Sequence, residues 1–313
     1  MEVALQVFLF VGGLAVALVA SDRAVAYTRA LAAALGAPPF IVGVVLVSIG
    51  TDLPELANSI AAHAEGEGDV NVGDSVGSTL TQYTLVLGLF PLVASTIAIE
   101  RRQVGLVTIL TAAGLGLTTF FVADGWLGHW EGAALILAWA VFTVVVVKGL
   151  PGQAADEPPA VRHQRRLVQA GVVLAALAIV GLGATVAVRA LVRLAEMAGA
   201  PEFLLAFFGA SIGTSSPEIV VDITALRRGA PGIALGDALG SSLVDATLSI
   251  GAGPLLFPAE VTPRLAIAGS VYTLVAVVAV GTVLGVRRRH DRASALVLLA
   301  LYALSYLVLL RVV

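Results

Sequence analysis

Long apolar runs separated by short polar stretches dominate this chain. Ten runs are long enough to be read as membrane-spanning helices, since about 20 apolar residues cross a bilayer as an α-helix. They cover residues 3–20, 39–62, 71–95, 104–122, 130–149, 167–188, 202–226, 232–256, 265–286 and 293–311. The pattern therefore predicts an all-α, polytopic membrane protein with ten transmembrane helices.

The ten runs divide into two halves of five. A polar linker at residues 151–166, rich in proline and charge, separates a first half at 1–150 from a second at 167–313. Each half carries a related stretch, at 36–90 and 199–253, with a constant offset of 163 residues. Because five is odd, the second half must enter the membrane from the opposite side, so two inverted repeats are predicted.

The positive charges predict the orientation of these helices. With the N-terminus outside, 14 of the 18 Lys and Arg residues fall in loops that face the cytoplasm, and 4 face outward. Cytoplasmic loops carry such an excess in membrane proteins. We therefore expect a multi-pass protein of the cell membrane, with a cytoplasmic linker, both termini outside, and the lipid bilayer as its surroundings.

Composition agrees with this class and excludes several others. Hydrophobic residues make up 58% of the 313, and the mean hydropathy is +0.98. There is no cysteine, which excludes disulfides and cysteine metal sites. No nucleophile–base pair or phosphate-binding loop is recognisable, so the chain is predicted to be no enzyme, to bind no nucleic acid and to hold no organic cofactor. The four histidines lie in loops or at helix ends and are interpreted as surface groups.

The second apolar run of each half is interrupted by a polar motif. The motif reads SIGTDLPE at 48–55 and SIGTSSPE at 211–218. A proline clashes with the carbonyl four residues earlier and cannot donate to it. The predicted helix-breaking residues, with the carbonyls of the two glycines freed, are Gly50, Pro54, Gly213 and Pro217.

Oxygen-bearing side chains share helix faces around these breaks. Residues four apart lie on one helix face, and this spacing joins Thr51 to Glu55, Thr214 to Glu218, Ser78 to Gln82 and Ser241 to Asp245. Brought together, they would form an all-oxygen cage whose anionic members are Glu55, Glu218 and Asp245. Hard cations such as Ca²⁺ prefer such ligands, whereas copper and zinc favour softer or nitrogenous ones.

These motifs resemble the cation/calcium exchangers, in particular the prokaryotic Na⁺/Ca²⁺ branch with its paired alpha repeats and G-T-S-x-P-E core. The resemblance implies Ca²⁺ ligation by Glu55, Glu218, Thr51 and Thr214. It implies sodium or central positions for Ser78, Ser241, Gln82, Asp245, Asp52 and Ser215, with backbone carbonyls around Ser48 and Ser211. Asp52 departs from the usual serine, Gln82 from asparagine, and Asp74 and Asp237 from the common Gly-Asn pair.

The function expected on this resemblance is antiport of Ca²⁺ against Na⁺ by alternating access, with both ions as transported substrates. The first and sixth runs carry no site residues and are expected to move. A H⁺/Ca²⁺ antiporter is the alternative, which Asp52 favours, because clustered carboxylates protonate readily. A passive cation channel is a more distant one. A capping role is an open alternative for Asp52 and Ser215, and it is the favoured interpretation of Asp74 and Asp237.

Overall fold

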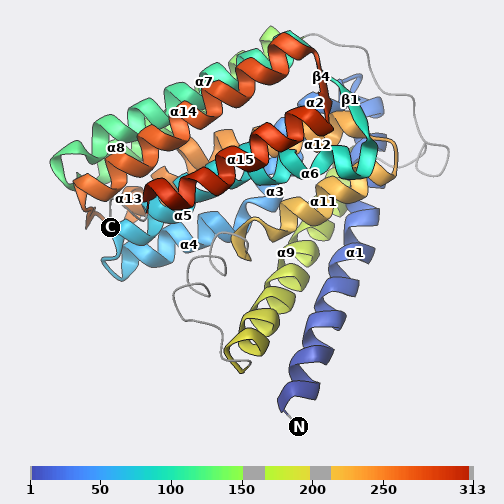
Figure 1. Ribbon diagram of the computed structural model, residues 1–313, viewed down its shortest axis with the longest axis horizontal. Helices are drawn as coiled ribbons and strands as arrows, with labels where there is room; N and C mark the ends of the chain where they lie inside the picture. Colours follow the sequence, from blue (N-terminus) through green and yellow to red (C-terminus); the bar gives the residue numbers. More distant parts are fainter. Residues whose placement is uncertain (1, 151–165, 198–212, 310–313) are drawn as a thin grey trace. The chain divides into compact units, whose positions relative to one another are not determined.

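The computed structural model describes residues 2–150, 166–197 and 213–309. These residues are almost entirely helical, which confirms the predicted all-α class (Figure 1). Three of the helical segments are π-helical turns, labelled η1, η2 and η5, and η3 is a short 3-10 turn.

The first half contains α1 (Glu2–Leu35), α2 (Pro39–Val42), η1 (Gly43–Val47), α3 (Ser48–Thr51), α4 (Leu53–Ala64), α5 (Gly68–Thr81), η2 (Gln82–Val86), α6 (Leu87–Ala94), β1 (Thr96–Ala98), α7 (Arg101–Phe121), η3 (Val122–Asp124), β2 (Trp126–Leu127) and α8 (His129–Gly149). The described part of the second half contains α9 (Arg166–Met197), α11 (Ser216–Arg227), α12 (Pro231–Val244), η5 (Asp245–Ser249), α13 (Ile250–Leu256), β3 (Ala259–Glu260), α14 (Pro263–Arg287), β4 (Arg289–Asp291) and α15 (Arg292–Leu309).

Seven helices within the described ranges are long and apolar enough to cross a membrane. The bent pair Pro39–Thr51 and Leu53–Ala64 adds an eighth, and α15 is an apolar but shorter helix. The predicted run at 202–226 lies partly outside the described residues. The protein is thus a multi-pass helical membrane protein, and the count of ten stays a prediction.

The bounds of the elements repeat at the offset of the motifs. Adding 163 to the bounds of α4, α5 and η2 gives those of α11, α12 and η5. The strands β3 and β4 also begin 163 residues after β1 and β2. Similar sequence patterns therefore start and break the helices at equivalent positions in the two halves.

The chain folds as two compact units that do not coincide with the two sequence halves. The first unit comprises residues 1–53 and 152–237, and the second comprises 54–151 and 238–313. Each unit takes segments from both halves, because helices of one half pack against their counterparts in the other. The linker therefore separates the two halves of the sequence, but it does not separate the two packed units.

In the first unit α1 and α9 lie side by side (Figure 1). They approach most closely at Gly13 and Gly183: a Cβ added to Gly13 would lie 2.6 Å from the Gly183 carbonyl oxygen, and the reverse distance is 2.8 Å. Small residues allow such close contact between membrane helices, where packing rather than hydrophobicity holds them together.

Polar contacts tie α11 to α1 within the same unit. The hydroxyls of Ser21 and Thr224 are 2.8 Å apart and buried. The Nε atom of Arg228 donates to Asp22 at 2.7 Å, in an exposed ion pair. Further along, η1 packs against α12 at Gly43, where a Cβ would lie 2.9 Å from the Cα of Gly236. Within this unit, α11 therefore contacts α1, and the start of α12 contacts η1.

In the second unit α7 lies beside α14, α8 beside α13, and α6 beside α15 (Figure 1). Two small antiparallel sheets join its loops, with β1 paired to β4 and β2 to β3. In their registers Ile97 faces His290, and Leu127 faces Ala259. Each sheet therefore pairs one strand from the first half with one from the second.

Two of the histidines predicted to be surface groups are buried, so that interpretation is wrong for His63 and His290. The Nδ1 atom of His63 lies 2.8 Å from the Phe257 carbonyl oxygen. The Nε2 atom of His290 lies 2.6 Å from the carbonyl of Leu87. Both imidazoles are buried because they supply hydrogen bonds to main-chain carbonyls at helix ends and breaks. His129 is exposed as expected, and His163 lies outside the described residues.

Candidate cation site

The interrupted helices break at Asp52 and Ser215, one residue after each Gly-Thr pair. Their backbones adopt nearly the same conformation, with φ −79° and ψ 6° at Asp52 and φ −80° and ψ 8° at Ser215. Pro54 and Pro217 follow within the first turn of α4 and α11, where proline is tolerated because the first amides have no helical partner. In the first half the two helical segments meet at 45°.

The predicted helix-breaking residues have distinct local roles. Gly50 lies in α3, where a Cβ would lie 3.1 Å from the Cβ of Leu177 on α9, so glycine allows close packing there. The carbonyl of Gly213, which Pro217 leaves without an amide partner, accepts a hydrogen bond from Ser216 Oγ at 2.8 Å. One lone pair of this carbonyl, which was predicted to be free for an ion, is therefore used locally.

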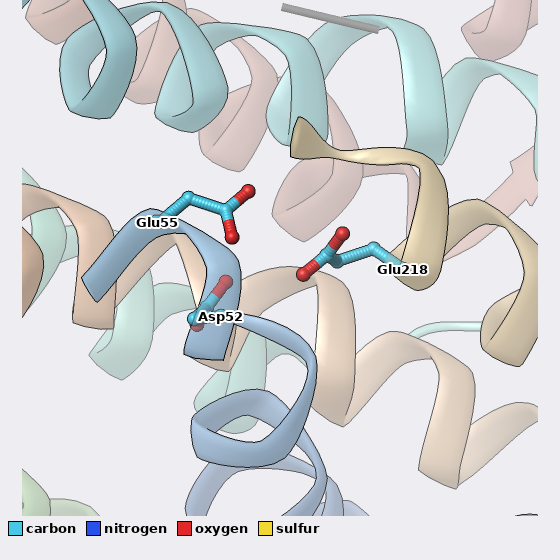
Figure 2. Close-up of side chains that lie close together, drawn as sticks. All are labelled: Asp52, Glu55 and Glu218. Carbon is cyan, nitrogen blue, oxygen red and sulfur yellow. The ribbon is translucent and has the colours of Figure 1, made fainter. Parts of the chain in front are cut away.

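Three buried carboxylates gather at the break. Asp52, Glu55 and Glu218 have 0% exposure, and one oxygen from each lies within 4.8 Å of the others. Asp52 and Glu55 belong to one continuous segment across the end of α3 and the start of α4, and Glu218 lies in the first turn of α11 (Figure 2). Buried charges of like sign need a counter-charge, and oxygen ligands suit Ca²⁺ and Na⁺ better than soft metals.

The sequence predicted both glutamates of this group, with Asp245 as a third anionic member of the cage and Asp52 at a sodium-type position. The structure brings Asp52 close to both glutamates. Asp245 is also fully buried and lies in the second unit, as do Gln82, Ser78 and Ser241.

Hydroxyl groups of the motifs lie close to the break. Thr51 Oγ1 is within 3.2 Å of the Val47 carbonyl, the Ser48 carbonyl and Asp237 Oδ1. Ser48 Oγ donates to Val44 at 2.6 Å, within the π-helical turn η1. A hydroxyl has one hydrogen and two lone pairs, so both oxygens can still accept a cation.

Ser215 is fully buried, and its hydroxyl makes no capping hydrogen bond to α11. The capping alternative is therefore not realised at this residue. Thr214 is half-buried just before the break, and Ser211 lies outside the described residues.

Gln82 and Asp245 are each the first residue of a π-helical turn, η2 and η5. Such turns widen a helix and are frequent at functional sites. Within them, the hydroxyls of Thr84 and Thr247 donate to the Leu80 and Leu243 carbonyls. Sequence reasoning missed both turns, and the matched threonines were the only signal that could have indicated them.

Gln82 has a partner that the sequence did not indicate. Its Oε1 accepts a hydrogen bond from Ser242 Oγ at 2.9 Å, inside the second unit. A glutamine reaches one methylene further than asparagine, which accounts physically for this departure from the family pattern. The Ser242 hydroxyl also lies 2.8 Å from the Ala238 carbonyl, and its single hydrogen can serve only one of these two acceptors at a time.

Two further buried carboxylates, Asp222 and Asp237, belong to the first unit. Asp237 was expected to cap α12, but its Oδ1 accepts a hydrogen bond from Thr51 at 3.2 Å. Asp222 lies one turn after Glu218 on α11. From the sequence alone, Asp222 could either line the access path or face water. Its side chain is fully buried, which decides against a position in water.

Comparison with known proteins matches this chain to one family over most of its length. The sequence profile of the sodium/calcium exchanger protein family matches residues 5–148 and again residues 168–311. The putative antiporter CaxA of Alkalimonas amylolytica is 28% identical over 301 residues, which are 92% of this chain and 93% of that protein. The sodium/calcium exchanger MaX1 of Methanosarcina acetivorans is 26% identical over 282 residues, 77% of this chain and 80% of that protein.

The inner membrane protein YrbG of Escherichia coli K12 is 28% identical over 267 residues, which cover 82% of this chain and 81% of YrbG. Among solved structures, the sodium-calcium exchanger NCX_Mj soaked with Na⁺ and without Ca²⁺ superposes with a TM-score of 0.80. The sequences are 21% identical, and the match covers 97% of this chain and 98% of that one. The two proteins share a fold.

Proposed function

Because this chain belongs to the sodium/calcium exchanger protein family, which both of its halves match, we propose that it is a secondary antiporter that exchanges Ca²⁺ for Na⁺ across the membrane. The observation that carries the proposal is the buried group of Asp52, Glu55 and Glu218. Carboxylates inside membrane helices are costly and mark ion pathways. Ca²⁺ and Na⁺ would compete for this one site.

In the full proposal, Ca²⁺ is bound by Glu55, Glu218, Thr51 and Thr214. The sodium and central positions are formed by Ser78, Ser241, Gln82, Asp245, Asp52 and Ser215, together with backbone oxygens near Ser48 and Ser211. Every described member of this set except the half-buried Thr214 is buried. This supports the assignment, since a polar group in a membrane protein interior needs a partner or an ion.

The architecture that we propose is ten transmembrane helices in two inverted five-helix repeats. The constant offset of 163 residues between element bounds supports it, as does the separate family match of each half. The distribution of Lys and Arg supports termini outside the cell membrane. Inverted repeats place substrate sites at broken helices near the midplane and permit alternating access.

We infer that α1 and α9 move as a pair during alternating access. They pack on one another at Gly13 and Gly183 within the first unit. Neither helix contributes a residue to the proposed ion site, so a shift of the pair need not break the ligand set.

Coupling to H⁺ is a second candidate, and Asp52 is the observation that favours it. The first motif has a carboxylate where the second has Ser215, so the cluster holds one more negative charge than a symmetric pair of motifs would. Carboxylates close together in a low-dielectric site bind protons readily, and a proton could then replace Na⁺.

The test is uptake of ⁴⁵Ca²⁺ into Na⁺-loaded proteoliposomes diluted into Na⁺-free buffer, at two fixed pH values. Uptake should require internal Na⁺, and Glu55→Gln and Glu218→Gln should each lower it at least about tenfold, as loss of even an outer-shell metal partner does. Glu65→Gln, an exposed glutamate that follows α4, is the matched control and should transport normally.

A second series replaces the Na⁺ gradient with a pH gradient. Uptake driven only by the pH gradient, and abolished by Asp52→Ser, would assign the protein to H⁺/Ca²⁺ exchange. Uphill accumulation of Ca²⁺ in either series would exclude a passive channel. Normal transport by both glutamate variants would show that the site assignment is wrong.

A further inference from the structure

The contact between Gln82 and Ser242 has more acceptors than its hydroxyl can serve, and an amide donor that it does not use. Both side chains are fully buried. The Ser242 hydroxyl lies 2.9 Å from Gln82 Oε1 and 2.8 Å from the Ala238 carbonyl oxygen, but it has one hydrogen. Among the described residues, Gln82 Nε2 has no acceptor. A buried N–H without an acceptor is costly, so these hydrogen bonds are incomplete.

A half-turn of the Gln82 amide group would complete them. It exchanges the positions of Oε1 and Nε2, which have nearly the same size and the same distance from the chain. Nε2 then donates to Ser242 Oγ, and the Ser242 hydroxyl gives its hydrogen to the Ala238 carbonyl. The donor of each contact has one acceptor in this orientation. The amide oxygen is then directed away from Ser242, with both of its lone pairs available.

The oxygen released in this way belongs to a residue of the proposed ion site. Gln82 follows Ser78 by four residues, so the two share a helix face, and it is the first residue of the π-helical turn η2. A cation attracts an amide oxygen and repels an amide N–H. A bound cation would therefore favour the rotated amide, in which Oε1 can act as a ligand and Nε2 is held by Ser242.

The equivalent position of the second half has no orientation to set. Asp245 is the counterpart of Gln82, and its carboxylate presents an oxygen whichever way it is turned. Thr79, the counterpart of Ser242, donates its hydrogen to the Ser75 carbonyl at 3.0 Å. An amide, in contrast, presents an oxygen in only one of its two orientations. A residue that selects the orientation is therefore useful beside Gln82 and not beside Asp245.

We propose that Ser242 is a positioning residue for the ion site, which accepts a hydrogen bond from Gln82 Nε2 and so directs Oε1 to a bound cation. Ser242 itself touches no ion. The inference rests on the proposed function in one respect, that Gln82 contributes to a cation site. Partners that orient the ligands of a metal in this way typically contribute about 10–100-fold to its affinity.

The test is equilibrium binding of ²²Na⁺ to the purified protein in detergent. Ser242→Ala should weaken Na⁺ binding about tenfold, because nothing then selects the orientation of the amide. Ser242→Thr keeps the hydroxyl and copies the residue of the first half, so it should bind nearly as the wild type does. Ser242→Val has the shape of the threonine variant without its hydroxyl and should repeat the loss.

A double-mutant cycle separates positioning from a general effect on packing. Gln82→Glu replaces the amide by a group of the same shape that presents an oxygen in either orientation. In that background, Ser242→Ala should change the Na⁺ affinity by less than about twofold. Thr79→Ala removes the equivalent hydroxyl of the first half and is the matched control, which should bind Na⁺ as the wild type does.

Two results would overturn the proposal. One is an unchanged Na⁺ affinity in both Ser242→Ala and Ser242→Val. The other is an equal loss on Ser242→Ala in the wild-type and Gln82→Glu backgrounds, because Ser242 would then support the fold without orienting the amide.

This proposal and the exchange function can fail separately. Wild-type protein that binds ²²Na⁺ and shows the expected cycle, yet exchanges no Ca²⁺, would retain the role of Ser242 and refute the exchange function. Wild-type protein that exchanges Ca²⁺ for Na⁺, with no coupling between Ser242 and Gln82, would retain the function and refute the role of Ser242.

Discussion

At the scale of single residues, some buried polar side chains are explained by main-chain carbonyls that have no amide partner in their helix. Pro91 and Pro254 lie inside α6 and α13 and leave the carbonyls of Leu87 and Ile250 without their usual helical donors. The Leu87 carbonyl accepts from His290 Nε2 at 2.6 Å. The Ile250 carbonyl accepts from Asn71 Nδ2 at 3.0 Å. Both bonds join segments from different halves of the chain.

Replacement of His290 by alanine tests this account. The Leu87 carbonyl would be left buried and unsatisfied, so we expect His290→Ala to lower the free energy of unfolding by about 1–3 kcal/mol. His290→Gln keeps an N–H donor and should recover part of the loss. Thermal unfolding in detergent measures both changes. His129→Gln is the control, since His129 also contacts a carbonyl, that of Leu255, but is exposed.

The same histidine predicts a dependence on pH. Burial lowers the pKa of His290 below its ordinary value of 6.5. The hydrogen bond to Leu87 and the charge of Asp291 raise this pKa, but by less than burial lowers it. The unfolded chain therefore binds a proton at a higher pH than the folded one. Stability should fall as the pH drops below 6.5 and level off once the folded histidine is protonated. A pH profile of His290→Gln as steep as that of the wild type would contradict this.

At the scale of elements, the two interrupted helices and the π-helical turns η2 and η5 hold most of the residues of the proposed site. The breaks at Asp52 and Ser215 and the turns η2 and η5 lie at equivalent positions, whereas the counterpart of η1 falls outside the described residues. The contacts around these elements are not all duplicated. A hydrogen bond between Ser21 and Thr224 joins α1 to α11, whereas the counterparts of these residues, Ala184 and Ala61, cannot form one. The duplication of elements therefore does not extend to every contact between them.

The crossing of α1 and α9 can be tested with two adjacent glycines. A Cβ at Gly13 would meet the Gly183 carbonyl and the Ala187 amide nitrogen at 2.6 and 2.9 Å. Gly13→Ala should therefore separate the helices and destabilise the protein by about 1–3 kcal/mol. A Cβ at Gly12 would meet nothing within 4 Å in the described chain, so Gly12→Ala is the control and should be neutral. Equal melting temperatures of the two variants would show that this contact is not tight.

At the scale of the whole molecule, the small sheets bear on the orientation in the membrane. The pairing of β1 with β4 joins two loops that the charge distribution places in the cytoplasm. The pairing of β2 with β3 joins two loops that it places outside. Paired strands must lie on the same side of a bilayer, and both pairings meet that requirement.

Labelling of single cysteines tests the orientation directly, because the chain has no cysteine of its own. Thr96 and Glu260 are exposed positions in β1 and β3. A membrane-impermeant thiol reagent applied to intact cells should label Glu260→Cys and leave Thr96→Cys unlabelled until the cells are opened. The opposite result would invert the proposed topology, and labelling of both would refute it.

Local sequence patterns were enough to predict the class of the protein, most of its helices, its internal duplication and the oxygen-bearing residues of the two motifs. These follow from local patterns, because an apolar run in lipid must satisfy its backbone as a helix. Spacing along a helix also determines which side chains share a face, as with Thr51 and Glu55.

The contacts between these groups, in contrast, depend on how the helices pack. The tertiary structure placed Asp52 with Glu55 and Glu218, paired Gln82 with Ser242, and brought His290 to the Leu87 carbonyl. The members of each set come from segments far apart in the chain or from a bend that propensity does not indicate. Periodicity predicts the face on which a residue lies, but the partner of that face is determined by packing.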